Sequence, residues 1–359
     1  AGAPVPPQVV QRMLELLPKD AQFWTPYGAT ECLPVAVIEG RELLALRSRT
    51  ETGAGTCVGR PVAPNEVRII RISDTAIAHW DNSLQVGAGQ VGEITVAGPS
   101  ATDSYYNRDA QTALAKIQET LSDGSTRIVH RMGDLGWFDA DGRLWFCGRK
   151  SQRVVMDEVT TLCTEQVEPY FNTRPDVART ALVGVGEAGK QTPVLLFELA
   201  AGSRANPVEV ADELRYIANG LVHTAKISHF LHYPKPFPVD IRHNAKISRE
   251  KLAVWAAKKL RIKQAQLRYL LLVAVDFLAK PCAAACWRKV TLWPVSAAAG
   301  MQGWMCWGCA SCRAIWQTLT PCSRPLPKVS MQCCITLPRP GPGAVMPAIS
   351  APMCWARGM

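Results

Sequence analysis

Acidic residues are confined to the first 276 positions of this 359-residue chain, and their distribution limits where a folded domain can lie. Residues 1–276 contain all 30 Asp and Glu, together with 32 Lys and Arg. Residues 277–359 contain eight Lys and Arg and no acid. Charged residues make up about a quarter of an average globular domain. We therefore expect the folded part in the first segment, and the net charge of +10 belongs mainly to the tail.

The basic tail does not predict a nucleic-acid partner, because its eight basic residues are scattered and form no stripe. No apolar run reaches the roughly 18–20 residues that a membrane-spanning helix needs, and no signal peptide is visible. The cysteines before the tail are widely spaced, which is typical of reduced thiols; they are Cys32, Cys57, Cys147 and Cys163. We expect a cytoplasmic protein with no transmembrane segment.

Hydrophobic periodicity predicts mixed helices and strands. Apolar residues three and four apart predict a helix over 5–18, and a strand-like run over 22–25 follows it. Short β-rich runs, among them 76–80, fill residues 53–99, and the turn at 139–142 predicts a hairpin. Further elements are predicted at 107–119 (helix), 177–185 and 193–199 (strands), and 207–221 and 246–260 (helices).

The stretch Tyr27-Gly28-Ala29-Thr30-Glu31 combines residue types that suit a magnesium nucleotide. A glycine permits a sharp turn and a close approach of backbone N–H groups to a ligand. Tyr27 can cover a flat base, Thr30 can reach a phosphate oxygen, and Glu31 can hold a hard cation. Five residues of this kind also occur in ordinary loops, so both interpretations remain open at this point.

Eight short motifs follow one another in order over about 250 residues. They are Ala1-Gly2-Ala3-Pro4, Tyr27-Gly28-Ala29-Thr30-Glu31, Val58-Gly59-Arg60-Pro61 with Glu66-Val67-Arg68-Ile69, Gly92-Glu93-Ile94 with Gly98-Pro99, Tyr106-Asn107-Arg108, Arg131-Met132-Gly133-Asp134-Leu135-Gly136, Gly148-Arg149 and Asn244-Ala245-Lys246-Ile247. In this order they resemble the adenylate-forming acyl-activating superfamily, which includes acyl-CoA synthetases, peptide-synthetase adenylation domains and luciferases.

The resemblance implies an α/β and α+β fold class. Residues 1–52 would end a large α/β adenylation domain, and residues 53–149 would form its β-rich subdomain, a small barrel. Residues 150–260 would form a small, mobile α+β domain. Residues 261–359 lie beyond the resemblance and show no persistent helical or strand period.

The resemblance also implies a nucleotide site with ATP or AMP and Mg²⁺ as cofactors. Gly2 and Ala3 would line the adenine site, and Tyr27 would lie against the base, followed by Gly28. Thr30 would contact the α-phosphate. Glu31 would hold Mg²⁺, which offsets phosphate charge as a carboxylate attacks the α-phosphorus.

Three residues would complete the site. Asp134 would accept hydrogen bonds from the ribose hydroxyls, Arg149 would support the ribose, and Lys246 would bridge the attacking carboxylate and the ribose or phosphate oxygens. Asp134 also suits a plain turn, and Lys246 a surface lysine. Lys226, in a similar run, is a rival. We prefer Lys246, because Pro238 and Asn244 precede it and a predicted helix follows it, as in the family's closing motif.

This chain departs from the superfamily pattern in three places. The Ser/Thr/Gly-rich phosphate loop would lie upstream, so we expect this chain alone to adenylate poorly or not at all. Ser151 stands at the hinge position, where Asp or Lys is usual. Residues 154–163 lack the glycine that lets a backbone lie beside a pantetheine thiol arm, which argues against a CoA ligase.

Within the superfamily, the sequence looks closest to the bacterial β-lactone synthetases of olefin biosynthesis. This resemblance implies that the substrate's own β-hydroxyl would attack the acyl-adenylate. The substrate would be a fatty-acid-type carboxylate, for example a 2-alkyl-3-hydroxy acid, and other enzymes of the same pathway would be its partners. Two alternatives remain: an acyl-CoA synthetase, and a non-catalytic remnant that only binds nucleotide.

The tail beyond residue 276 holds nine of the 13 cysteines and six of the 11 tryptophans. The spacing of Cys306, Cys309 and Cys312, with Cys322 as a fourth ligand, permits a metal site. A second hypothesis is that the tail is a disulfide-rich or amphipathic interaction segment. We favour a third, a reading-frame artefact, because a GC-rich coding region read in the wrong frame yields an excess of Cys, Trp, Arg and Pro.

Overall fold

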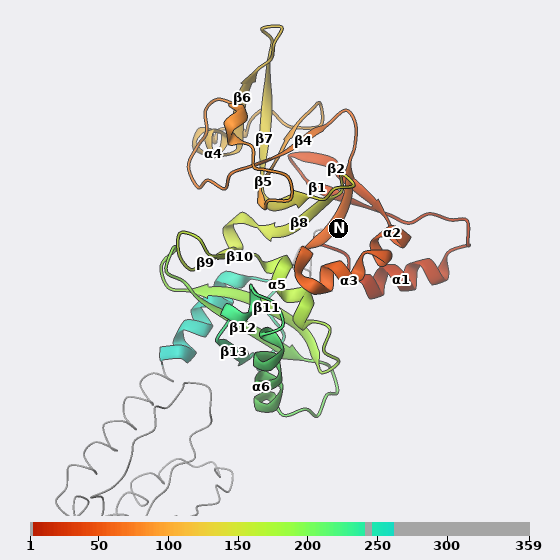
Figure 1. Cartoon of the computed structure of the whole chain (residues 1–359), viewed down its shortest axis with the longest axis vertical. Helices are drawn as coiled ribbons and strands as arrows, with labels where there is room; N and C mark the ends of the chain where they lie inside the picture. Colours follow the sequence, from red (N-terminus) through yellow and green to blue (C-terminus); the bar gives the residue numbers. More distant parts are fainter. Residues whose placement is uncertain (1–2, 241–245, 262–359) are drawn as a thin grey trace, which may run out of the picture. The chain divides into compact units, whose positions relative to one another are not determined.

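The computed structural model describes residues 3–240 and 246–261, all within one compact unit. Its largest feature is an eight-stranded sheet in which every pair of neighbours is antiparallel (Figure 1). The strand order is β1 (Trp24–Ala29), β2 (Cys32–Glu39), β3 (Thr56–Pro61), β8 (Leu144–Arg149), β7 (Thr126–Phe138), β5 (Gly92–Ala97) and β4 (Glu66–Ile70), and β6 (Lys116–Thr120) also pairs with β7.

The sheet is built around a central pair of buried strands. Every residue of β5 is buried, and most of β7 is buried as well. Side chains from six strands form one core on this sheet; they include Cys32, Val35, Val58, Ile69, Ile94, Val96, Met132, Leu144 and Phe146. Burial of these apolar side chains stabilises each of them by about 1.5–3 kcal/mol relative to exposure.

Short helices lie next to the first strands. They are α1 (Pro7–Leu16), α2 (Gly40–Ala45), α3 (Arg47–Arg49) and the π-helix η1 (Thr50–Ala54). The helix predicted over 5–18 is therefore confirmed as α1, with a proline at its first position, where no N–H donor is needed. Val10 of α1 packs with Ile38, Leu43 and Trp145.

Three local predictions are wrong. The helix predicted over 107–119 is α4 (Asp109–Ala115) followed by strand β6, because Ile117 and its neighbours pair with β7. The strand predicted at 76–80 is reduced to one bridge, between His79 and Gln118, and the nearest regular element is the short helix η2 (Asn82–Leu84). Gly28 is not in a turn; it lies in β1 at a register shift, where a Cβ would come within 2.6 Å of the Cys32 carbonyl oxygen.

Residues 150–261 form a second layered region around a three-stranded sheet, β11-β12-β13, whose last pair is parallel. Its elements are η3 (Lys150–Gln152), β9 (Val154–Val155), β10 (Thr161–Leu162), α5 (Thr164–Phe171), β11 (Val177–Val185), β12 (Thr192–Leu199), α6 (Pro207–Ala218), η4 (Thr224–Lys226), β13 (His229–His232) and a helix over 249–261. The strands predicted at 177–185 and 193–199 and the helix at 207–221 are confirmed.

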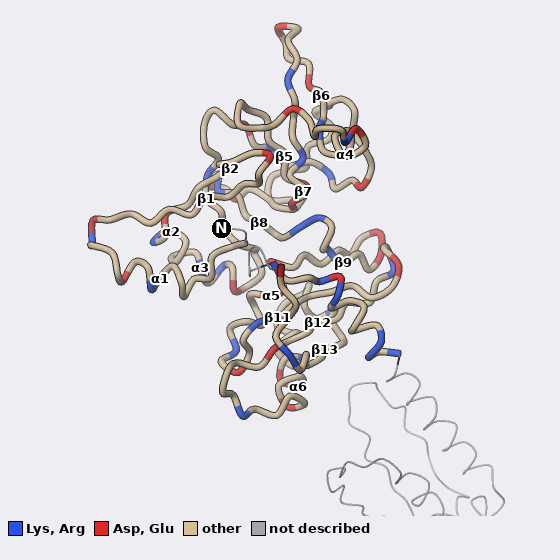
Figure 2. Tube along the Cα trace, turned by 180° about the vertical axis from the view of Figure 1, so that it is seen from behind, with Lys and Arg blue, Asp and Glu red and all other residues tan. Residues whose placement is uncertain are grey.

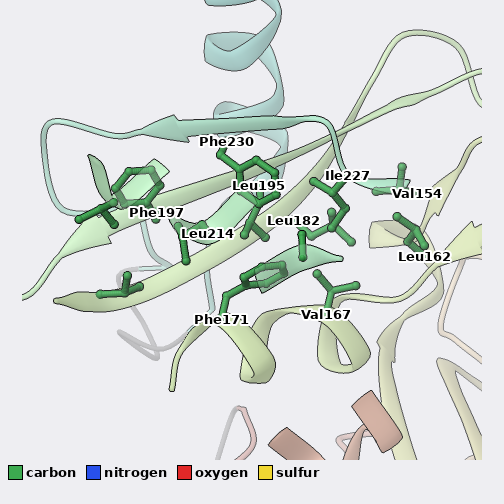
Figure 3. Packing of buried hydrophobic residues seen from close by; sticks show 13 residues of the cluster. Val154, Leu162, Val167, Phe171, Leu182, Leu195, Phe197, Leu214, Ile227 and Phe230 are labelled. Atoms are coloured by element: carbon green, nitrogen blue, oxygen red, sulfur yellow. The ribbon is translucent and has the colours of Figure 1, made fainter. Parts of the chain in front are cut away.

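The core of this second region lies between α5, α6 and the sheet (Figure 3). The rings of Phe171 and Phe230 meet edge-on with centroids 5.8 Å apart, a favourable geometry for aromatic pairs. The side-chain oxygen of Asn206 caps α6 by accepting the N–H of Val208 at 3.0 Å.

The expected domain boundaries at 52/53 and 149/150 stay predictions. One sheet crosses residue 52/53, since β2 pairs with β3. Across 149/150, the Gly53 carbonyl accepts a hydrogen bond from Gln166 at 3.2 Å. The described helix over 249–261 runs through the expected boundary at 260/261, which stays a prediction. The predictions for the tail, including the cysteine set from Cys306 to Cys322, concern residues outside those described.

Among the described residues, none of the helices is both long and apolar enough to cross a membrane. The four cysteines described are free and buried, as their sequence spacing predicts.

Glu165 on α5 is expected to make stability depend on pH. Burial, aided by the charge of Glu168, raises the pKa of Glu165 to about 7 from 4.5, against a hydrogen bond from Thr56 (2.9 Å) and the charge of Arg249. The folded state therefore binds a proton that the unfolded state has lost between pH 4.5 and 7. Stability should fall by about 1–3 kcal/mol as the pH rises through this window, and then level off.

Urea unfolding at a series of pH values from 4 to 8 measures this dependence. Glu165→Gln should flatten the decline, because it removes the titrating group. Glu209→Gln, at an exposed position of α6, should leave it unchanged. An unaltered pH profile in Glu165→Gln would contradict the assignment.

Candidate functional site

The side chains of Asp134 in β7 and Tyr27 in β1 contact each other. The Tyr27 hydroxyl donates to Oδ2 of Asp134 at 2.7 Å, although the two residues are 107 positions apart. Arg149 lies directly opposite Asp134 in the β7–β8 register, and its Nη1 is 3.0 Å from Oδ1 of Asp134. The Tyr27 ring also packs against Phe146, with centroids 5.7 Å apart. The structure thus brings together three residues that the sequence motifs single out separately.

One oxygen of Asp134, Oδ1, is buried and lies 3.0 Å from Nη1 of Arg149. The contact is an ion pair whose angle falls outside hydrogen-bond geometry, so among the described residues Oδ1 has a charged neighbour but no well-aligned hydrogen-bond donor. A buried acceptor of this kind costs free energy unless a donor reaches it. A hydroxyl group on a bound molecule would supply that donor.

The charge of Asp134 depends on its neighbours. Burial raises the pKa of its carboxyl group, while the charge of Arg149, the hydrogen bond from Tyr27 and the charge of Lys246 act in the opposite direction. Lys246 is exposed and immediately precedes Ile247, which forms an antiparallel bridge with Val239. Its positive charge is therefore close enough to Asp134 to favour the carboxylate.

Glu31 occupies the turn between β1 and β2, next to the exposed Thr30. The Tyr105 hydroxyl donates to Oε1 of Glu31 at 3.0 Å. Burial alone would raise the pKa of Glu31. A hydrogen bond from its own backbone, the one from Tyr105, the charge that His130 carries at low pH, and the charge of Arg149 outweigh burial and hold this pKa below its usual value. Glu31 is therefore ionised at neutral pH.

A polar cavity of about 270 Å³ opens beside Glu31. It is lined by charged and polar side chains from three strands and the segment after β8, including Glu31, Glu93, His130, Arg131, Arg149 and Lys150. Figure 2 shows the basic stretch of the chain between β8 and β9 that contributes to this wall. Arg131 and Lys150 pair with Glu93. Glu31 and Arg149 supply further charge of both signs, which suits an anionic ligand and its counter-cation.

The donor set around Glu31 fits one class of cation. The described residues contain no group of three or more His, Cys, Asp or Glu side chains placed to share a metal. A metal that requires a full protein cage is therefore not expected at Glu31. Mg²⁺ needs only one or two carboxylates, because it keeps several waters and takes phosphate oxygens from its substrate.

The other candidate residues divide into two groups. Thr30 and Gly28 lie beside Glu31 and Tyr27, and the half-buried Ala3 is described, but Gly2 lies outside the described residues. Lys226, the rival of Lys246, donates to Oγ1 of Thr160 at 2.9 Å and is not among the groups whose charges act on Asp134. The roles of all these residues stay predictions.

The sequence motifs missed three residues of the cavity. Burial and the nearby charge of Lys116 lower the pKa of His130 to about 4, so its imidazole is neutral. Lys150 donates to Glu93 at 2.8 Å, and Tyr105 binds Glu31. Tyr105, His130 and Lys150 each stand next to a quoted motif in the sequence, which was the only signal available for them.

Comparisons with known proteins point in one direction. Residues 1–106 match the family described as AMP-binding enzyme. The chain is 65% identical over 260 residues to an olefin beta-lactone synthetase of Stenotrophomonas maltophilia (strain K279a), which covers 72% of this chain and 47% of the relative. Identity to the olefin beta-lactone synthetase of Xanthomonas campestris pv. campestris is 64% over 262 residues, or 72% of this chain and 46% of that protein. The chain thus spans about half the length of these curated relatives.

Solved structures confirm the mixed α/β fold class. The amide bond synthetase McbA from Marinactinospora thermotolerans superposes with a TM-score of 0.52 at 25% identity, over 71% of this chain and 46% of that chain. An o-succinylbenzoate coenzyme A synthetase from Bacillus subtilis, solved with AMP, has a TM-score of 0.50 at 20% identity, over 70% of this chain and 44% of that chain. The second likeness concerns the fold alone.

Proposed function

We infer that this chain belongs to the adenylate-forming, AMP-binding enzymes, and we propose that it forms part of an ATP-dependent β-lactone synthetase. The substrate would be a fatty-acid-type carboxylate with a β-hydroxyl group. The chain's identity of 65% with an olefin beta-lactone synthetase over 260 residues supports the reaction class. The observation on which the nucleotide site rests is the buried Oδ1 of Asp134, which lacks a well-aligned hydrogen-bond donor among the described residues.

The site would hold the nucleotide through four side chains. A ribose hydroxyl would donate to Oδ1 of Asp134, while Tyr27 keeps the other carboxylate oxygen engaged. Arg149, opposite Asp134 in the sheet, would support the ribose. Glu31 would hold Mg²⁺, which when bound offsets negative charge on the phosphates.

The reaction would proceed in two steps. A substrate carboxylate oxygen attacks the α-phosphorus of ATP, the bond to the bridging oxygen breaks, and pyrophosphate leaves with the electron pair. The β-hydroxyl oxygen then attacks the acyl carbon, loses its proton, and AMP departs, which closes the four-membered lactone. Lys246 would stabilise negative charge on the reacting oxygens in the first step. Intramolecular attack gains its rate from proximity.

Nucleotide binding is tested directly on this chain by isothermal titration calorimetry with AMP. Wild-type protein should bind AMP, and Asp134→Ala should bind it about 10- to 100-fold more weakly, because a charge-assisted hydrogen bond contributes about 1.5–3 kcal/mol. Asp212→Ala, which removes an exposed carboxylate of α6, is the matched control. Equal affinities of Asp134→Ala and wild type would overturn the site.

Lactone formation is tested in a chimera in which residues 1–260 replace the matching part of the Stenotrophomonas maltophilia relative. With a 2-alkyl-3-hydroxy fatty acid and ATP, mass spectrometry should detect β-lactone, AMP and pyrophosphate. Acyl-CoA as the only product, in the presence of CoA, would replace this proposal with the acyl-CoA synthetase alternative. Nucleotide binding without any acyl product would favour the non-catalytic one.

A further inference from the structure

We propose that Tyr105 is a positioning residue that orients the Glu31 carboxylate for a divalent cation beside a nucleotide phosphate. This inference rests on the proposed function, because it gives the cation a nucleotide partner. Tyr105 lies outside the quoted sequence motifs, immediately before Tyr106-Asn107-Arg108.

The segment that carries Tyr105 holds Glu31 at two points. The Tyr105 hydroxyl donates to Oε1 of Glu31 at 3.0 Å, and the backbone N–H of Thr102 donates to the Glu31 carbonyl oxygen at 2.8 Å. The first contact sets the direction of the carboxylate, and the second sets the position of its backbone. Glu31 is thus held at both ends by one short stretch of chain that is about seventy residues away in sequence.

That stretch is itself anchored to α4 and β6. The backbone N–H of Tyr105 donates to Oγ1 of Thr112 in α4 at 3.0 Å. Lys116, the first residue of β6, donates to Oγ1 of Thr102 at 3.0 Å, and its ammonium lies 5.8 Å from the centroid of the Tyr105 ring. These contacts with α4 and β6 therefore fix the position of the Tyr105 hydroxyl.

A fixed carboxylate matters more here than in a site with many protein ligands. Among the described residues, Glu31 alone has a metal role implied by the motifs. Mg²⁺ bound through one carboxylate takes its other ligands from water and phosphate. If the Tyr105 hydroxyl is removed, the Glu31 side chain regains rotamers that cation binding must then restrict. Loss of a hydrogen-bond partner of a metal ligand typically weakens metal binding by 10- to 100-fold.

The test measures how tightly the AMP-saturated chain binds Mn²⁺, a substitute for Mg²⁺. Electron paramagnetic resonance gives the concentration of free Mn²⁺ at each point of the titration. Tyr105→Phe should weaken Mn²⁺ binding about tenfold and leave metal-free AMP affinity unchanged. Glu31→Gln should weaken it at least as much. The double variant should be no weaker than Glu31→Gln, because Tyr105 acts only through Glu31.

Tyr106→Phe is the matched control, because it removes the same hydroxyl group one residue away, from a side chain that is 91% exposed. It should bind Mn²⁺ as wild type does. Equal Mn²⁺ affinities of Tyr105→Phe and wild type, additive losses in the double variant, or no Mn²⁺ bound by the wild-type AMP complex would each overturn the inference. Failure of wild type to bind AMP would instead refute the proposed nucleotide function, so the two failures are distinguishable.

Discussion

Replacing Arg131 by methionine is expected to lower the free energy of unfolding by about 3–5 kcal/mol. Both partners of the Arg131–Glu93 ion pair are 1% exposed, and Nη2 of Arg131 is 2.7 Å from Oε2 of Glu93. The guanidinium also donates to three backbone carbonyls, those of Ser73, Thr75 and Leu114, at 2.6–2.9 Å. Its removal takes away the main partner of the buried Glu93 carboxylate, which keeps only Lys150, and it removes a donor from the carbonyl oxygens of Thr75 and Leu114.

Urea unfolding followed by circular dichroism measures this loss. Arg215→Met, which removes the cation from an exposed ion pair with Asp212, is the matched control and should cost about 0–1 kcal/mol. Arg131→Met combined with Glu93→Met should be less destabilised than Arg131→Met alone, because the buried carboxylate that has lost its guanidinium is then removed, and the less deeply buried Lys150 keeps its hydrogen bond to the Ser73 carbonyl. A loss in Arg131→Met no larger than in Arg215→Met would contradict this account.

The same buried cluster also bears on the candidate site. Arg131 and Glu93 line the cavity beside Glu31, and Lys150 joins them with hydrogen bonds to Glu93 (2.8 Å) and to the Ser73 carbonyl (2.7 Å). The cluster therefore connects the segment after β8 to β5 and β7. Stability and site geometry depend here on the same contacts.

The pairing of Asp134 with Arg149 shows how far sequence reasoning reaches. The turn at 139–142 predicts a β7–β8 hairpin, and local turn chemistry normally sets the register of such a hairpin. Near the turn, Phe138 faces Leu144 and Gly136 faces Phe146. Continued unchanged, that register would place Asp134 opposite Gly148.

A bulge between Leu135 and Gly136 shifts the register by one residue, so that Asp134 faces Arg149. The motif residues could thus be found from sequence, but their contact could not, because the bulge depends on how the whole sheet packs. Local elements such as β11 and α6 were predicted well, since their periodicity and caps lie within the element. Tyr105 was missed, because its partner Glu31 is 74 residues away in sequence. Strand β6 pairs with the nearby start of β7, and it was missed because residues 107–119 were predicted as one continuous helix.

Replacing Lys246 by alanine is expected to slow adenylation by about 10²–10³-fold in the chimera described above. A cation placed where negative charge develops typically contributes that much to the rate. Lys246 is suited to this role, because its charge acts on Asp134 and so lies near the ribose position of the proposed site. Its flexible ammonium can follow the charge as it moves between carboxylate and phosphate oxygens.

The rate of pyrophosphate release, with ATP and the hydroxy acid saturating, is the measurement. Lys226→Ala is the matched control, because Lys226 also lies in an Ala-Lys-Ile run but donates to Thr160. We expect it to retain nearly the wild-type rate, and we expect AMP affinity to change little in either variant. A large loss in Lys226→Ala with a wild-type rate in Lys246→Ala would transfer the catalytic role to Lys226. A wild-type rate in both variants would exclude a lysine from either position in the chemical step.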